Sequence, residues 1–560
     1  MAARRLRETW FATACVALLV ALFITLLIPS ASHAATGRAR LIEAVKSGDL
    51  AAVRAVLPQA DVNAGQEDGT TPLHWAVQLD KAPVVDLLLE NGARADAANR
   101  YGTTPLALAC TNGNAGIIER LLKAGVKADS PFRTGETPLM VAARSGQTDA
   151  VKVLLAHGPD VNARATSRGQ TALMWAAARG DVAMIKTLLE AGANVGLTTP
   201  RLTRKDPNRE TDFQGRDSQT ASGYRFAAVD PSGFSALTFA VREGHIDAVT
   251  ALLDGGANVN DVLADGTSAL VLALMNAHFE LAAVLLDRGA NPNANAQGWT
   301  ALHQAVRIRR AATRFYTAPV PTGTMDSFDL IKKLIASGAQ VNARMWRNGL
   351  NDGERTRFVR MGATSFLLAA KIGDLQVMQL LLANGANPLT PTVENLTPLM
   401  AAAGVDLYNP AEDAGSNPEH MAERLEAVTL CVQLGTDVNA VTSENETALH
   451  GAVYLGSPAV VEHLAAHGAT LDVKNDRGWT PLAIAKGAAW ADFFKEYPQI
   501  VPVLTRLMQE QGISVEGHVA DANICKECFT TRGGEVARML KVEREFESDE
   551  ALATALKNAH

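Results

Sequence analysis

Two cysteines near the end of the chain have the clearest potential for chemistry, because Cys525 and Cys528 form a C-x-x-C motif. In an exported protein such a pair forms a local disulfide by default, and it can also supply thiolates to a metal or a redox centre. Attachment of c-type haem would require histidine directly after the second cysteine, where Phe529 stands. Zinc would require two further ligands, and His518 is the only histidine nearby. A thioredoxin-like context is missing, so the motif leaves a disulfide or a metal site open and gives weak support to redox chemistry.

Three histidines, His74, His303 and His450, each follow a Thr-x-Leu tripeptide. Several copies of the repeated sequence pattern described below lie between them, so they cannot converge on one metal ion. The sequence lacks Gly-x-Ser-x-Gly, His-Glu-x-x-His and phosphate-binding Gly-Lys-Ser/Thr motifs. Its carboxylates are scattered over predicted helix ends and turns without forming an acid–base pair. These features predict a protein that is not an enzyme and has no cofactor and no catalytic metal.

The elements that must position these side chains recur with a period of about 33 residues. Gly69, Gly102 and Gly135 are 33 residues apart, and so are Gly233 and Gly266. Shortly after the glycine comes Thr-Pro-Leu or Thr-Ala-Leu, in which Thr suits an N-cap and Pro suits the first helical position. A short Ala-rich helix, a tight turn and a second helix with an apolar stripe follow. The second helix ends at another glycine, which can adopt the left-handed C-cap conformation.

These motifs resemble the ankyrin repeat, and the segment DGTTPLHWAV (68–77) is close to the family pattern word for word. The resemblance implies an all-α repeat solenoid, with about twelve helix-turn-helix units over residues 37–512 and projecting β-turn fingers. The expected units are 37–65, 66–98, 99–131, 132–165, 166–198, 231–262, 263–294, 295–344, 361–392, 393–440, 443–474 and 475–512. In the family, the histidine of this motif supports the turn by hydrogen bonding, which is the role implied for His74, His303 and His450.

Four insertions interrupt the period. Residues 196–230 and 345–360 fall between repeats, whereas 311–326 and 404–419 fall between the two helices of a repeat. Long loops in a repeat array are either functional or disordered, and the sequence leaves both readings open.

The N-terminal residues 1–34 have the layout of a secretory signal peptide, with three arginines, an apolar run over 11–28 and small residues before a cleavage site after Ala34. The apolar run is also long enough to span a bilayer, so a retained signal anchor is the alternative. Both carry the rest of the chain across the membrane. We therefore expect a periplasmic or secreted protein, or one anchored to the membrane and facing the periplasm. Residues 513–560 form a C-terminal tail that carries the C-x-x-C motif.

Composition narrows the class of protein further. The chain has 560 residues, more than one compact core usually holds. It carries 52 Lys and Arg against 59 Asp and Glu, a net charge of −7, which argues against a general nucleic-acid binder. Five cysteines are too few for a disulfide-dense scaffold.

The resemblance also implies where a partner would bind, because ankyrin proteins meet partners with their turn tips and the exposed part of the first helix of each repeat. By that pattern the predicted contact residues are Tyr101, Arg144, Arg168, Arg179, Phe234, Arg242, Trp299, Arg307, Lys371, Tyr454 and Trp479. Aromatic and Arg side chains are the usual anchors of protein interfaces. Five of them could form a basic stripe for an anionic partner, or could simply be solvated: Arg144, Arg179, Arg242, Arg307 and Lys371.

Together these features predict a non-catalytic, exported scaffold that binds an unidentified partner protein as a monomer. No nucleic acid is expected, and a membrane is expected only through an uncleaved N-terminal anchor. Two alternatives are a protein whose C-x-x-C tail carries redox or metal chemistry, and a secreted effector that acts on host proteins.

Overall fold

The structure is a computed structural model that describes residues 37–133, 135–200, 232–310, 320–346, 358, 360–405, 407, 421–490 and 493–519. The predicted signal segment 1–34, most of each predicted insertion and the C-x-x-C motif lie outside these ranges. Within the ranges, no helix is both long and apolar enough to span a bilayer. Contacts between residues divide the chain into two units, of which the first holds residues up to Pro200 together with 247–257, and the second holds the remainder.

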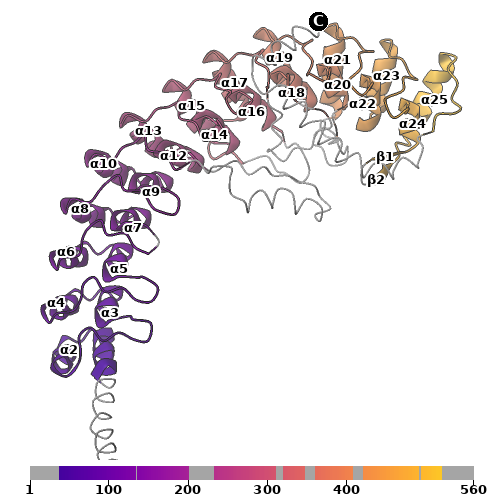
Figure 1. Cartoon of the computed structure of the whole chain (residues 1–560). Coiled ribbons are helices and arrows are strands. Elements are labelled where there is room, and N and C mark those ends of the chain that lie inside the picture. The colour runs from indigo at the N-terminus through magenta and orange to yellow at the C-terminus, as the bar shows by residue number, and fades with distance from the viewer. Residues whose placement is uncertain are drawn as a thin grey trace, which may run out of the picture. The chain divides into compact units, whose positions relative to one another are not determined.

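The first unit is built from helix pairs stacked in two rows (Figure 1). We call the first helix of each pair inner and the second outer. A helix over 37–47 precedes α2 (Leu50–Val56) and its 3-10 extension η1 (Leu57–Gln59). The inner row continues with α3 (Pro72–Gln78), α5 (Pro105–Asn112), α7 (Pro138–Ser145) and α9 (Ala172–Arg179). The outer row runs from α2 through α4 (Ala82–Glu90), α6 (Ala115–Lys123), α8 (Thr148–Ala156) and α10 (Val182–Glu190). Most of α13 (Ile246–Asp254) also belongs to this unit.

The second unit repeats the arrangement. Its inner row comprises α12 (Ala236–Glu243), α14 (Ala269–Met275), α16 (Ala301–Arg307), α18 (Ser365–Lys371), α20 (Pro398–Ala403), α22 (Ala448–Leu455) and α24 (Pro481–Lys486). Its outer helices are α15 (Phe279–Asp287), α17 (Ser327–Ala336), α19 (Leu375–Ala383), α21 (Met421–Gln433), α23 (Pro458–Ala466) and α25 (Val501–Glu510). The prediction of an all-α repeat solenoid is confirmed. Strands β1 (Ala488–Trp490) and β2 (Phe493–Lys495) add an antiparallel hairpin inside the last helix pair.

Local sequence explains where the helices begin and end. At the start of α3, the Thr71 hydroxyl accepts a hydrogen bond from the His74 backbone N–H, and Pro72 occupies the first helical position. At the end of α7, Gly146 takes a left-handed conformation (φ 76°) that stops the helix. Between these ends lie fully buried alanines such as Ala142, which let neighbouring inner helices approach closely.

An asparagine clamp, which was not predicted from the sequence, ties the ends of five outer helices to the preceding repeat. The Asn162 side chain donates to the carbonyl of Gly192 (3.1 Å) and accepts from the backbone N–H of Asn194 (2.7 Å). The same two-bond arrangement recurs at Asn63, Asn293, Asn342 and Asn439. The available signal was an Asn four residues after the glycine that ends an outer helix, as Asn162 follows Gly158.

Candidate interaction surface

The predicted contact residues of the first unit are exposed. Tyr101 has 67% of its surface open to solvent. Arg144, Arg168 and Arg179 are exposed as well. These four side chains lie on the fingers, the loops that precede each inner helix, and on inner-helix ends.

Most of the predicted contact residues of the second unit are not exposed, and the expectation that they face solvent is wrong for five of them. The buried residues are Phe234, Trp299, Lys371, Tyr454 and Trp479. Two further residues, Arg242 and Arg307, are half-buried.

Each finger contains a glycine shortly before its inner helix. The buried aromatic residues of the fingers differ from the exposed Tyr101 in their position relative to this glycine. Tyr101 precedes that glycine and sits at the tip of the turn, whereas Phe234, Trp299 and Trp479 follow it directly. A residue after the glycine is on the part of the chain that returns towards the helices, so its ring packs inward. The Phe234 ring, for example, lies 4.9 Å from that of Phe239.

Lys371 and Tyr454 are buried for separate reasons. Lys371 ends α18 beside α21, whose Arg424 donates to the Lys371 carbonyl (2.7 Å). Tyr454 turns inward because its hydroxyl donates to the buried carboxylate of Glu446 (2.6 Å). Lys371 is 8% exposed, so it adds no accessible charge to the predicted basic stripe.

The two remaining arginines of the second unit cover aromatic rings. Arg242 lies over the rings of Phe234 and Phe239 (5.2 and 5.1 Å) and pairs with Glu243 (2.6 Å). Arg307 lies over the ring of Trp299 (5.6 Å). In both cases the guanidinium stabilises the base of its own finger through a cation–π contact.

The fingers of the first unit carry a row of exposed arginines. Arg100 donates through Nη2 to the carbonyl of Glu67 in the preceding finger (2.6 Å), and Arg133 donates through Nη1 to the carbonyl of Arg100 (3.0 Å). Arg168 is exposed on the next finger. Arg100 and Arg133 were not among the predicted contact residues, although their spacing of 33 residues was the available signal.

Two further arginines lie at the ends of the inner helices of the same repeats. Arg144 of α7 pairs with Glu136 (3.3 Å) and lies over the half-exposed ring of Trp175 (5.6 Å). Arg179 of α9 donates to the carbonyl of Arg144 (3.3 Å). We call the five residues on these fingers and helix ends the arginine face: Arg100, Arg133, Arg144, Arg168 and Arg179.

The repeated histidines are structural, as the resemblance implied. In His74, Nδ1 accepts from the Thr71 backbone N–H (3.2 Å), which leaves Nε2 to donate to the Thr103 carbonyl of the next finger (3.0 Å). His303 and His450 make the same contacts with their own neighbours. Burial lowers the pKa of His303 to about 4. Among the residues that the structure describes, no group of three or more His, Cys, Asp or Glu side chains could hold a metal ion.

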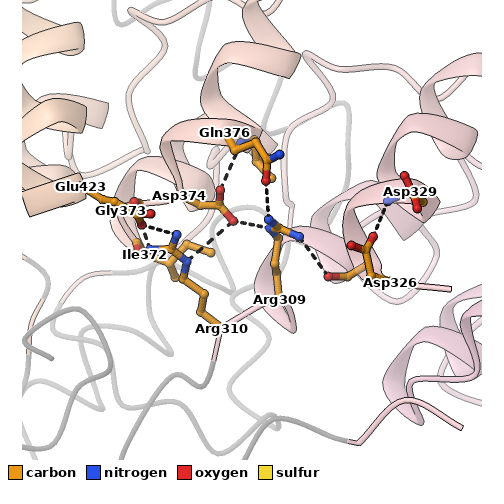
Figure 2. A network of polar contacts seen from close by, with 11 residues as sticks. Arg309, Arg310, Asp326, Asp329, Ile372, Gly373, Asp374, Gln376 and Glu423 are labelled. Carbon is orange, nitrogen blue, oxygen red and sulfur yellow. Dashed lines mark hydrogen bonds and ion pairs between the residues drawn. The ribbon is translucent and has the colours of Figure 1, made fainter. Parts of the chain in front are cut away.

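A buried ionic network joins three successive repeats of the second unit (Figure 2). Asp374, fully buried at the N-cap of α19, forms an ion pair with Arg309 and lies 3.8 Å from Arg310. Arg309 also donates to Gln376 (2.8 Å), and Arg310 pairs with Glu423 of α21 (2.5 Å). The network links the segment directly after α16 to α19 and α21, and we assign it a role in holding these repeats in register.

His518 was the one histidine near the C-x-x-C motif that could have completed a metal site. Its Nδ1 lies 2.8 Å from the Thr480 hydroxyl and its Nε2 lies 2.9 Å from the Ser514 carbonyl. Both ring nitrogens therefore already have oxygen partners. Cys525 and Cys528 themselves lie outside the described residues.

Comparison with known proteins places the repeats in a family. Sequence models of ankyrin repeats in three copies match residues 41–131, 117–199 and 237–314, and a single-repeat model matches 361–392. The potassium channel AKT1 of Oryza sativa (subspecies indica and japonica) is 42% identical over 55 residues, which are 10% of this chain and 6% of the channel. A Caenorhabditis elegans homologue of transient receptor potential cation channel subfamily A member 1 is 29% identical over 125 residues, 22% of this chain and 9% of that protein.

Among solved structures, the crystal structure of the human ASB11 ankyrin repeat domain matches with 27% identity and a TM-score of 0.36, covering 45% of this chain and 98% of that domain. The chain spans less than a tenth of the length of the curated channels that it matches, so the likeness concerns their repeats. The matched repeats, their capped helix pairs and the histidine-supported fingers agree with one another, and the chain belongs to the ankyrin-repeat proteins.

Proposed function

We propose that the protein is an exported, non-catalytic scaffold that binds a partner protein through the fingers and inner-helix ends of its first unit. The observation that carries this proposal is the contrast in exposure between the two units. Tyr101 and the arginine face of the first unit are open to solvent, whereas most of the matching side chains of the second unit are buried.

The fingers of the first unit also have the rigidity that recognition favours. Backbone hydrogen bonds join consecutive fingers, such as the one from the Arg100 N–H to the Asp68 carbonyl (2.7 Å). Asparagine clamps at Asn63 and Asn162 hold the outer-helix ends of two of these repeats. A surface fixed in this way loses little conformational entropy when it binds.

Site-specific crosslinking in cells tests this binding surface. A photoreactive amino acid placed at Tyr101 in the full chain should capture a distinct partner protein. The matched control places the same group at Lys152, which is exposed on the outer helix α8. The proposal fails if Tyr101 captures nothing, or if both positions capture the same proteins.

Export is tested separately, because it depends on residues 1–34 and not on the repeats. A bacterial alkaline phosphatase, which is active only after export, is fused behind the full chain and behind a chain that lacks residues 2–34. We expect activity from the first fusion alone. Equal activity from both, or none from either, would count against export.

A further inference from the structure

We propose that the arginine face of the first unit binds an acidic segment of the partner protein. This inference rests on the proposed function, since it names the chemistry of the partner at the same surface. Its five cations come from the fingers and inner-helix ends of three consecutive repeats: Arg100, Arg133, Arg144, Arg168 and Arg179.

These cations have few acidic neighbours within the chain. In the described part of the chain, no carboxylate oxygen lies within 4.0 Å of the guanidinium nitrogens of Arg100, Arg133, Arg168 or Arg179. Arg144 is the exception, because it pairs with Glu136. Beyond that distance Arg100 still interacts electrostatically with Asp68. The charges of Arg133, Arg168 and Arg179 remain to be neutralised, whereas Arg242 of the second unit already has Glu243 beside it.

Several of the guanidinium groups are also held in place by a hydrogen bond that leaves most of their N–H donors free. Arg100, Arg133 and Arg179 each donate one hydrogen bond to a backbone carbonyl of the preceding repeat. A guanidinium has about five N–H donors, so most of them stay available for a carboxylate. Fixing the side chain beforehand reduces the entropy lost when a partner binds.

The neighbourhood of Trp175 adds an apolar component to the same surface. Its ring is half-exposed under Arg144, whereas its indole nitrogen is buried. The apolar part of a bound polypeptide can pack against the exposed part of this ring. Such a combination suits a polypeptide with acidic side chains.

The charge of the whole chain favours a short acidic segment over a nucleic acid. The net charge is −7, so the field away from the arginine face repels an extended polyanion. Nucleic-acid binding gains most of its strength from many phosphate contacts along a duplex or strand. Five cations confined to three repeats match a peptide with a few carboxylates better.

The test uses a fluorescein-labelled decapeptide of alternating glutamate and serine, with binding to the full chain measured by fluorescence anisotropy. We expect binding at low salt that weakens as salt rises, because exposed charges are screened over about 10 Å at 0.1 M salt. The triple variant Arg100→Glu, Arg133→Glu, Arg168→Glu should bind at least about 30-fold more weakly, since rim charges act together on association.

Two further variants distinguish a loss of binding at the arginine face from a general loss of folding or of charge. Arg168→Glu alone should weaken binding about threefold, as expected for one exposed charge, and its side chain makes no hydrogen bond within the described residues. The matched control Lys123→Glu, Lys152→Glu, Lys186→Glu makes the same charge change on the outer helices α6, α8 and α10. We expect this control to bind within about twofold of the unmodified chain, because long-range effects of surface charges are screened.

Three results would overturn the acidic-segment proposal: no binding of the peptide at low salt, equal weakening in the outer-helix control, or tighter arginine-dependent binding of single-stranded DNA or of vesicles of anionic lipid. The proposed function fails in a different way. If Tyr101 still captures its partner in the triple variant, the scaffold function stands and only the acidic chemistry is wrong. If Tyr101 captures nothing in the unmodified chain, the scaffold function itself fails.

Discussion

Replacing Asp374 with alanine should destabilise the second unit by about 3 kcal/mol, a value assembled from two contributions. The Asp374 carboxylate caps α19 by accepting from the Val377 N–H (3.1 Å), and loss of such a cap costs about 1 kcal/mol. The change also leaves Arg309 and Arg310 without their shared buried anion. Removing one partner of a buried ion pair costs about 3–5 kcal/mol, reduced here because Gln376 and Glu423 remain.

Two companion variants separate the cap from the ion pairs. Asp181 caps α10 through the Met184 N–H (3.0 Å) and has no ion pair in the described residues, so Asp181→Ala should cost only about 1 kcal/mol. Asp374→Asn retains an oxygen acceptor for the cap and removes the charge. It should fall between the two alanine variants.

Hydrogen exchange followed by mass spectrometry suits this measurement, because repeat arrays do not unfold as one two-state unit. In Asp374→Ala, peptides from α16, α19 and α21 should exchange about 100-fold faster, which corresponds to about 3 kcal/mol of local opening free energy. Peptides from α7 and α8 should be unchanged. If Asp374→Ala and Asp181→Ala have equal local effects, the arginine network contributes nothing beyond the cap and the reasoning is refuted.

Three further measurements test the rest of the fold. Burial holds the folded-state pKa of His303 at about 4, against about 6.5 in the unfolded chain, so its share of stability is complete above pH 6.5 and falls by about 2 kcal/mol by pH 5. Protection factors of α16 peptides, measured by hydrogen exchange at pH 7 and pH 5, should show less of this loss at acid pH in His303→Gln, and an equal loss in both proteins would contradict it. Asn162→Ala removes both clamp hydrogen bonds and should cost about 1–2 kcal/mol, seen as faster exchange at the N–H of Asn194, while unchanged exchange would argue against the clamp. Burial raises the pKa of Cys431 to about 12 and that of Cys110 further, so neither thiol should react with Ellman's reagent at pH 8 until urea is added.

The repeat architecture could be predicted from residues close together in the sequence. Thr71 caps the helix that starts at the next residue, and Gly146 stops a helix that ends at the residue before it. Fully buried Ala142 and Leu154 occupy the apolar positions that the helical period indicates. Such features depend on hydrogen bonds and packing within one repeat, so the pattern carries enough information to place them.

The exposure of individual side chains could not be predicted in this way. Tyr101 and Trp479 both stand beside a finger glycine, yet the first is exposed and the second is buried. Arg309 and Asp374 are 65 residues apart and meet only when their repeats stack. A cap is satisfied by atoms three residues away, whereas burial and ion pairing depend on what the neighbouring repeat brings into contact. For this reason the repeat period and the helix ends could be predicted from the sequence alone. The burial of the predicted contact residues in the second unit, and the exposure of the arginine face in the first, were decided only by tertiary packing.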